Sequence, residues 1–163
     1  MLRKKWIYKS SVDAEKLKLL CDEWGIPELL AKVIYSRGFK KREDIESFLF
    51  PNLKKLRDPY ELRNMREAVL LLQDSIIKKR RIIILGDYDV DGITATALMV
   101  EFLRKCGVKN LDYFIPNRLK HGYGLTQIST EILLEMKPDL VITVDNGITS
   151  VAEVQRLKNE GVL

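Results

Sequence analysis

Residues 82–107 read IIILGDYDVDGITATALMVEFLRKCG, and their pattern is the strongest indication of the fold class. The four apolar residues at its start favour a short buried strand, and the long apolar run behind the aspartates favours a helix. Two further β-branched or aromatic runs follow at 111–116 (LDYFIP) and 140–144 (LVITV), with a helical stretch between them. Strands that alternate with helices predict an α/β fold with a doubly wound, mainly parallel sheet.

Besides the helical stretch between residues 116 and 140, three helices are expected next to these strands. The helix from Gly92 to Cys106 is apolar almost all round its first turns, which predicts that it is buried against the sheet. A last helix should begin with a capping box formed by Ser150 and Glu153, and it should end at Gly161. A helix of about four turns precedes the first strand. Its apolar stripe consists of Met65, Val69, Leu72 and Ile76.

Charge divides the chain into two parts. Residues 1–60 contain 14 Lys or Arg and 9 Asp or Glu, whereas residues 61–163 contain 14 of each, so the net charge of +5 lies in the first part. Short helices are expected between residues 12 and 50, so residues 1–60 form a small basic helical N-terminal segment before the α/β domain at 61–163. The charge asymmetry fits a phosphate-bearing partner such as a nucleic acid, and a solvated lysine-rich surface is the alternative.

Composition also limits the location and the metal chemistry. No run approaches the roughly 20 apolar residues of a membrane span, and the basic start MLRKKWIYKSS has no apolar segment behind it. We therefore expect a cytoplasmic protein without membrane contact. Two distant cysteines and one histidine do not suggest a disulfide framework or a zinc site, so any metal should bind to carboxylates.

Three aspartates stand at alternate positions where the first strand gives way to a helix. Asp87, Asp89 and Asp91 should lie beyond the carboxyl end of this strand, where ligands bind in open α/β sheets. Carboxylates packed so closely repel one another, and a divalent cation relieves the repulsion. Oxygen ligands without sulfur indicate Mg²⁺ or Mn²⁺.

Two other interpretations of the aspartates remain open. The pattern D-x-D-x-D-G also matches the first half of an EF-hand calcium loop, but Leu98 occupies the twelfth position, where a bidentate glutamate belongs. The aspartates could instead only cap the helix that follows, since an acidic side chain near a helix N-terminus is stabilising. Capping requires one aspartate, not three.

A fourth aspartate follows the strand at 140–144. Asp145 comes directly after this strand and before Asn146 and Gly147, which permit a sharp turn. Neighbouring strands lie roughly 4.8 Å apart, so carboxylates at two strand ends can share a metal. Asp145 is therefore predicted to join the first acidic cluster, although Asp-Asn-Gly after a strand is a common turn when taken alone.

The loop after the middle strand reads IPNRLKHGYGL (115–125) and resembles a phosphate contact. Arg118, Lys120 and His121 supply cations or donors for phosphates, and Tyr123 offers a ring on which a base can stack. These four residues are the predicted nucleic-acid-binding residues. An ordinary polar loop with glycine turns is the alternative.

With these segments in this order, the sequence resembles the RecJ branch of the DHH phosphoesterases. GDYDVDGITAT (86–96) resembles the first motif of the family, PNRLKHGYGL (116–125) resembles the loop after its second strand, and TVDNGI (143–148) resembles its second motif. The resemblance implies metal binding by Asp87, Asp89 and Asp91 in the first motif and by Asp145 in the second. It implies that Asp89, Asp91 and Asp145 are catalytic, and that Arg118 faces the DNA phosphates.

The resemblance also implies an activity. Two Mn²⁺ or Mg²⁺ ions would support 5′-to-3′ exonuclease hydrolysis of phosphodiester bonds in single-stranded DNA, in DNA repair and recombination. A helicase or a single-strand-binding protein would be a further partner of the complete protein. Residues 61–163 would then be the N-terminal part of a DHH-type catalytic domain.

One departure from the family pattern limits the expected activity. The third motif, Asp-His-His, is missing, and the chain stops at Leu163 as another strand would begin. We therefore expect a fragment with an incomplete metal site and little or no catalysis; a complete small domain with a short edge strand is the alternative. Two other functions stay open: hydrolysis of small phosphoanhydrides or cyclic dinucleotides, and a non-catalytic nucleic-acid-binding module.

Overall fold

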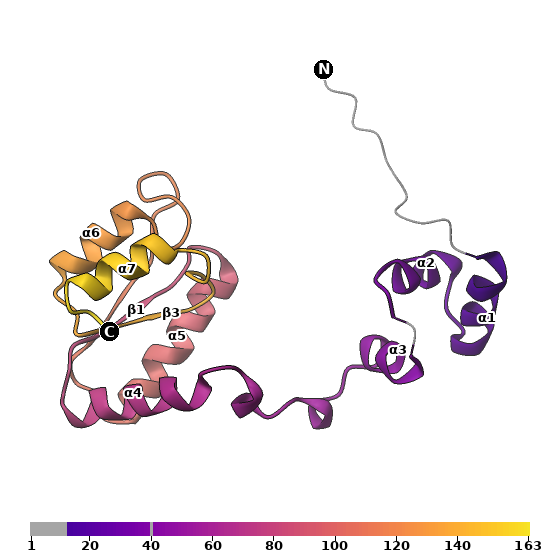
Figure 1. The fold of residues 1–163 in the computed structure, drawn as a ribbon, viewed down its shortest axis with the longest axis horizontal. Helices are drawn as coiled ribbons and strands as arrows, with labels where there is room; N and C mark the ends of the chain where they lie inside the picture. Colours follow the sequence, from indigo (N-terminus) through magenta and orange to yellow (C-terminus); the bar gives the residue numbers. More distant parts are fainter. Residues whose placement is uncertain (1–12, 40) are drawn as a thin grey trace, which may run out of the picture. The chain divides into compact units, whose positions relative to one another are not determined.

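A computed structural model describes residues 13–39 and 41–163 of the chain. The contacts divide it between Glu61 and Leu62 into two compact units, and each unit is described by itself (Figure 1). The first unit contains the helices α1 (Ala14–Trp24), α2 (Glu28–Ser36) and α3 (Arg42–Leu49), followed by the short 3₁₀ turns η1 (Leu53–Lys55) and η2 (Pro59–Glu61).

Capping residues set both ends of the first helix, and four buried side chains hold the first unit together. The Asp13 carboxylate accepts a hydrogen bond from the Glu15 amide and caps α1, and Gly25 ends this helix in the left-handed conformation. Four buried side chains, Leu17, Ala31, Ile34 and Ile45, form the core of this unit.

The positive charge of residues 1–60 lies mostly outside these helices. Residues 1–12 contain four Lys or Arg and no acidic residue, so residues 13–60 contain the other ten basic residues against all nine acidic ones. The described helices are therefore close to neutral. The predicted basic character falls mainly on residues 1–12, which lie outside the described residues.

The second unit contains a parallel sheet, as predicted. β1 (Ile82–Leu85) pairs with β2 (Leu111–Phe114) on one side and with β3 (Leu140–Thr143) on the other, giving the order β2-β1-β3. Leu163 adds a parallel pairing beyond β3, because its N–H donates to the Asp139 carbonyl and its carbonyl accepts from the Val141 N–H.

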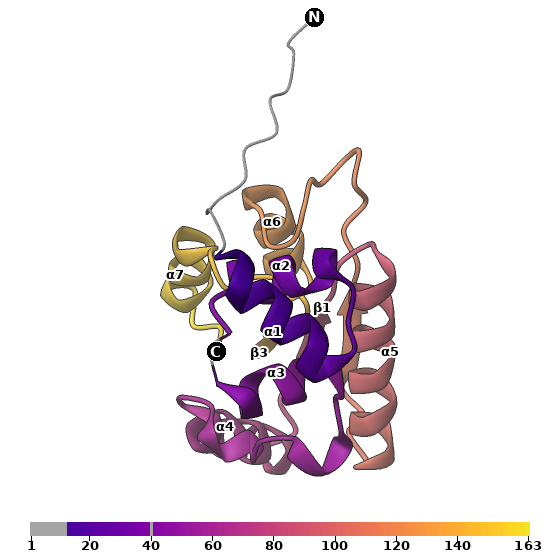
Figure 2. The ribbon, with the colours of Figure 1, turned by 90° about the vertical axis from the view of Figure 1, so that its right-hand side faces the viewer.

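Helices cover both faces of the sheet, which confirms the doubly wound α/β class. α4 (Met65–Ile77) and α5 (Val90–Lys105) cover one face, and α6 (Gln127–Glu135) and α7 (Val151–Asn159) cover the other (Figure 1). β1 is buried on both faces: Ile82 and Ile84 belong to the cluster with α5, whereas Ile83 and Leu85 belong to the cluster with α6 and α7. In Figure 2, β1 and β3 lie between α5 and α7.

The structure corrects two expectations for the helices. α5 is buried on one face only: Val100 and Leu103 are covered, but Leu98 is 73% exposed and Phe102 is 55% exposed. Ser150 precedes α7 without capping it, because its hydroxyl donates to the Leu125 carbonyl at 2.9 Å. The predicted capping box is therefore wrong, and a long-range contact takes its place.

The longest described helix, α5, has 16 residues. Within residues 13–39 and 41–163, no helix combines the length and the apolar character that crossing a bilayer requires.

Candidate functional site

The loop between β1 and α5 places two aspartates at the carboxyl edge of the sheet. Asp87 is 1% exposed, and one of its carboxylate oxygens accepts a hydrogen bond from the Tyr88 amide at 2.8 Å. Asp89 is the N-cap residue of α5, and its carboxylate accepts from the Gly92 amide at 2.9 Å. Helix capping therefore accounts for Asp89 in part, but it leaves the buried Asp87 unexplained.

Two glycines allow this loop to fold so closely. A Cβ at Gly92 would lie 2.5 Å from the Asp87 nitrogen and 2.6 Å from its Cα, so the first turn of α5 rests directly on the Asp87 backbone. A Cβ at Gly86 would collide with the Thr96 hydroxyl, which is buried and donates to the Gly92 carbonyl. The position of Asp87 thus depends on glycine at both sites.

Asp145 reaches the same place from β3. It has a φ of 63°, which is the left-handed region that Asp and Asn tolerate better than most residues. Gly147 follows with a φ of 91° and lies against the Thr143 side chain. This turn brings Asp145 to Asp87 and Asp89, and one carboxylate oxygen from each of the three lies within 4.8 Å of the others. The predicted meeting of the two motifs is present in the fold.

Asp91 does not belong to this group of three carboxylates. It stands in the first turn of α5 and lines a shallow depression together with Asp145 and Leu98. Its negative charge still acts on the site, since it contributes to the raised pKa of Asp145. Metal binding by Asp91 therefore stays a prediction, and the structure gives it an electrostatic effect.

The three carboxylates fit a divalent cation. Loss of hydration, followed by the charges of Asp89, Asp91 and Asp87, raises the pKa of Asp145 above its ordinary value. The second oxygen of Asp87 is buried and has no hydrogen-bond partner among the described residues. A buried carboxylate oxygen needs a partner, and hard oxygen donors suit Mg²⁺ or Mn²⁺, so this cluster could hold such an ion.

The raised pKa of Asp145 gives a first prediction for stability. In the folded, metal-free protein the negative charge of Asp145 is disfavoured, so its cost grows as the pH rises through the raised pKa. Below the ordinary pKa both the folded and the unfolded chain carry the proton, and the cost vanishes. We expect Asp145→Asn to raise the thermal midpoint in EDTA at about pH 7.5, because Asn is neutral and tolerates the left-handed conformation.

Thermal unfolding of both proteins between about pH 7.5 and pH 4 measures this effect. The advantage of Asp145→Asn should shrink as the pH falls, and saturating Mn²⁺ should reverse the order by stabilising only the wild type. A lower midpoint for the variant in EDTA at the upper end of this range would show that the carboxylates do not repel one another as the structure implies.

The loop after β2 carries the predicted nucleic-acid-binding residues, and one of them, Tyr123, lies within range of the charges of the acidic cluster. The Arg118 guanidinium lies over the Tyr88 ring at 5.5 Å from its centroid, and the Tyr88 and Tyr123 rings meet edge to face at 6.2 Å. Loss of hydration and the charges of Asp87, Asp145 and Asp89 raise the pKa of Tyr123. Tyr123 thus feels the charges of the acidic cluster, and Arg118 contacts Tyr88, which stands between Asp87 and Asp89 in the sequence.

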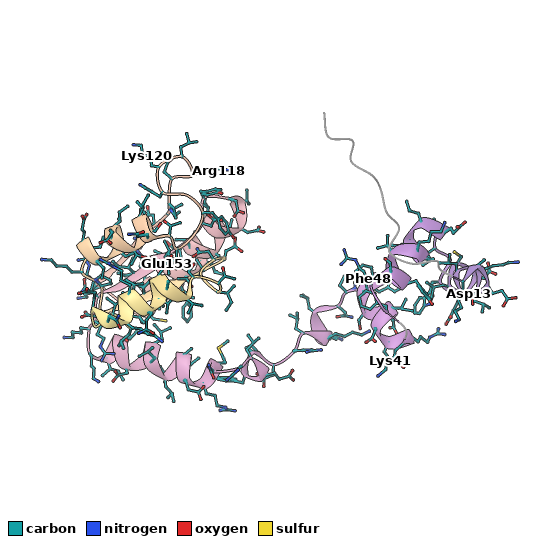
Figure 3. The ribbon with its side chains drawn as sticks, turned by 45° about the horizontal axis from the view of Figure 1, so that its top comes forward. Asp13, Lys41, Phe48, Arg118, Lys120 and Glu153 are labelled. Atoms are coloured by element: carbon teal, nitrogen blue, oxygen red, sulfur yellow. The ribbon has the colours of Figure 1, made fainter. Side chains whose placement is uncertain are left out.

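Lys120 and His121 differ in their surroundings. Lys120 is exposed, and Figure 3 shows it with Arg118 on the loop that projects from the edge of the sheet. His121 contributes to the loop itself: its Nδ1 accepts from the Asn117 amide at 2.9 Å, and its ring contacts Phe114. DNA binding by either residue stays a prediction.

Sequence reasoning missed Tyr88 and Gly92. Tyr88 lies between two of the predicted metal ligands, and it joins the acidic cluster to Arg118. The glycine of D-x-D-G signals a close backbone approach, but only the fold shows that it rests on Asp87.

Known proteins resemble this chain in sequence. The sequence model of the DHH family, N-terminal domain, matches residues 81–163. The single-stranded-DNA-specific exonuclease RecJ of Bacillus subtilis (strain 168) is 35% identical over 150 residues, which cover 92% of this chain and 19% of that protein. The chain therefore spans about a fifth of the length of this relative.

Two solved structures resemble the chain. A crystal structure of exonuclease RecJ bound to manganese is 42% identical with a TM-score of 0.57, over 62% of this chain and 26% of the other. A crystal structure of RecJ from Thermus thermophilus in complex with Mn²⁺ is 31% identical with a TM-score of 0.55, over 93% of this chain and 20% of the other. Both similar proteins bind manganese.

Proposed function

Since the chain belongs to the DHH family, we propose that it forms the first part of a metal-dependent exonuclease acting on single-stranded DNA. One observation carries the proposal: Asp87, Asp89 and Asp145 come from two separate motifs and place carboxylate oxygens within 4.8 Å of one another. The relatives that are exonucleases of this kind support the substrate class.

The carboxylates have distinct roles in this proposal. Asp87, Asp89 and Asp145 hold Mn²⁺ or Mg²⁺, and Asp91 either completes the ligand set or strengthens the negative potential beside Asp145. A bound divalent cation supplies Lewis-acid stabilisation of the charge that develops at phosphorus during phosphodiester hydrolysis. Of these residues, Asp89, Asp91 and Asp145 are the ones we propose as catalytic.

The loop after β2 binds and orients the strand. Arg118 donates hydrogen bonds to phosphate oxygens, and the Tyr88 ring beneath it limits the orientations of the guanidinium. Tyr123 stacks on a base, while Lys120 and His121 add phosphate contacts. Cleavage from the 5′ end, a role in DNA repair and recombination, action in the cytoplasm and a helicase or single-strand-binding partner belong to the same proposal.

Catalysis by this chain alone should be weak. Its single histidine, His121, contributes to the fold of the β2–α6 loop, so the chain lacks the paired histidines of the third family motif. Binding to single-stranded DNA, rather than turnover, is therefore the property that tests the proposal.

The test compares wild type with Arg118→Ala for binding to a fluorescein-labelled oligo(dT) in Mn²⁺ at several salt concentrations. Loss of one phosphate contact should weaken binding and reduce the slope of log affinity against log salt by about 0.7. Arg104→Ala is the matched control, because Arg104 is exposed near the end of α5 and pairs with Glu101.

Equal losses in both variants, or binding without salt dependence, would contradict a phosphate contact at Arg118. Displacement of the labelled strand at a much lower concentration of cyclic dinucleotide than of unlabelled oligo(dT) would instead indicate a small-molecule substrate at the same carboxylates.

A further inference from the structure

The side chain of Asn146 joins the ends of the two strands that carry the acidic cluster. Its Nδ2 donates to the Val144 carbonyl at 2.9 Å and to the Leu85 carbonyl at 3.4 Å. Leu85 is the last residue of β1 and also accepts from the Val144 amide at 2.9 Å. One amide group therefore connects the strand before Asp87 with the turn that contains Asp145.

Asn146 also contacts the loop that carries Arg118. Gly124 of this loop has a φ of 65°, and a Cβ there would lie 3.1 Å from the Asn146 Cβ. The same part of the loop is tied down on both sides, since Ser129 donates to the Gly124 carbonyl and Ser150 donates to the Leu125 carbonyl. The end of β1, the β3–α7 turn and the β2–α6 loop thus meet at one side chain.

The geometry of Asn146 suits a positioning role better than a purely stabilising one. Its Oδ1 is buried and has no hydrogen-bond partner among residues 13–39 and 41–163. A buried acceptor without a partner costs free energy, so the side chain contributes less to stability than a fully bonded asparagine would. The neighbouring Asp145 has a left-handed backbone. Such a conformation persists only when the surrounding structure holds the turn in place. The hydrogen bonds from the Asn146 side chain to the Val144 and Leu85 carbonyls supply this restraint on the turn.

We propose that Asn146 is a positioning residue for the metal site: its side-chain amide sets the separation of Asp145 from Asp87 and Asp89 and fixes the Arg118 loop beside them. This inference rests on the proposed function for its metal, but its hydrogen bonds can be tested without one. Removing the amide should release the β3–α7 turn and separate the carboxylates, as expected when a residue that orients metal ligands is lost.

The first measurement is exchange of the Asn146 side-chain amide protons with solvent, followed by NMR on the metal-free chain. Protons that donate to two strand-end carbonyls should exchange clearly more slowly than those of a free asparagine amide. Exchange at the free rate would show that the amide does not join the strands and would overturn the proposal.

The second measurement is calorimetric titration of Mn²⁺ into wild type, Asn146→Ala and Asn159→Ala, at a temperature where urea curves show all three folded. We expect Asn146→Ala to weaken Mn²⁺ binding about 10- to 100-fold and to change the Mn²⁺ electron paramagnetic resonance line width. Asn159→Ala removes an exposed hydrogen bond with Gln155 on α7 and should bind as the wild type does.

The outcomes separate the two proposals. If Asn146→Ala unfolds more easily but binds Mn²⁺ within twofold of the wild type, its role is structural only and this inference fails. If the wild type itself binds no Mn²⁺, the proposed metal site fails and the positioning role fails with it, while the exchange rates still decide whether the amide joins the strands.

Discussion

Asp89→Asn should weaken Mn²⁺ binding by at least about 100-fold, because it removes a carboxylate that binds the metal directly. Loss of a residue that only hydrogen-bonds to a metal ligand already costs about 10- to 100-fold in affinity. The substitution leaves the fold intact, since Asn caps helices about as well as Asp and can still accept from the Gly92 amide. Calorimetric titration of Mn²⁺ measures the effect, and circular dichroism checks the helix content.

Asp44→Asn is the matched control for this titration, because Asp44 lies in the first turn of α3 in the other unit and is exposed. Its Mn²⁺ affinity should equal that of the wild type. Equal affinities of wild type and Asp89→Asn would remove the metal site from the acidic cluster. The chain would then be better explained as a non-catalytic binding module.

Gly92→Ala should lower the free energy of unfolding by about 3 kcal/mol, at the upper end of the cost of overpacking a core. Two effects oppose each other at this position. Alanine in a helix gains about 1 kcal/mol over glycine, but the new Cβ would lie 2.5–2.6 Å from backbone atoms of Asp87, which cannot turn aside as a side chain can. The collision outweighs the helix propensity.

Urea unfolding measures this loss, and Mn²⁺ titration of the folded fraction tests its consequence. Because the Asp87 backbone must move, Gly92→Ala should also weaken metal binding, measured in the absence of urea. Thr94→Ala is the control in the same turn, since Thr94 is exposed and, among the described residues, its hydroxyl bonds only to helix carbonyls. A Gly92→Ala protein within about 0.5 kcal/mol of the wild type would show that the loop is less closely packed than described.

The acidic cluster shows where periodicity ceases to predict a site. The sequence predicts that Asp87, Asp89 and Asp91, at alternate positions after the first strand, all bind the metal. The chain becomes helical at Val90, however, and each helical residue turns by about 100° instead of about 180°. Asp91 is therefore displaced from the group that Asp87 and Asp89 form with Asp145.

The sequence alone determined the parallel α/β class, the order of strands along the chain and the meeting of two acidic motifs. These follow from local patterns: strand β1 is apolar on both faces, and parallel strands end at the same edge of a sheet. Each strand or helix repeats its apolar pattern along its whole length, so the pattern can be recognised without knowing which distant residues the element contacts.

Folding selects which polar side chains bond to residues that are distant in the sequence. Ser150 bonds to Leu125 instead of capping α7, and Asn146 bonds to Leu85 across 61 positions of sequence. Each outcome is a competition between a local partner and one that folding brings near, and the sequence does not contain their distance. Hydrogen bonds and close contacts act over a few ångströms, so the packed chain alone selects the partner.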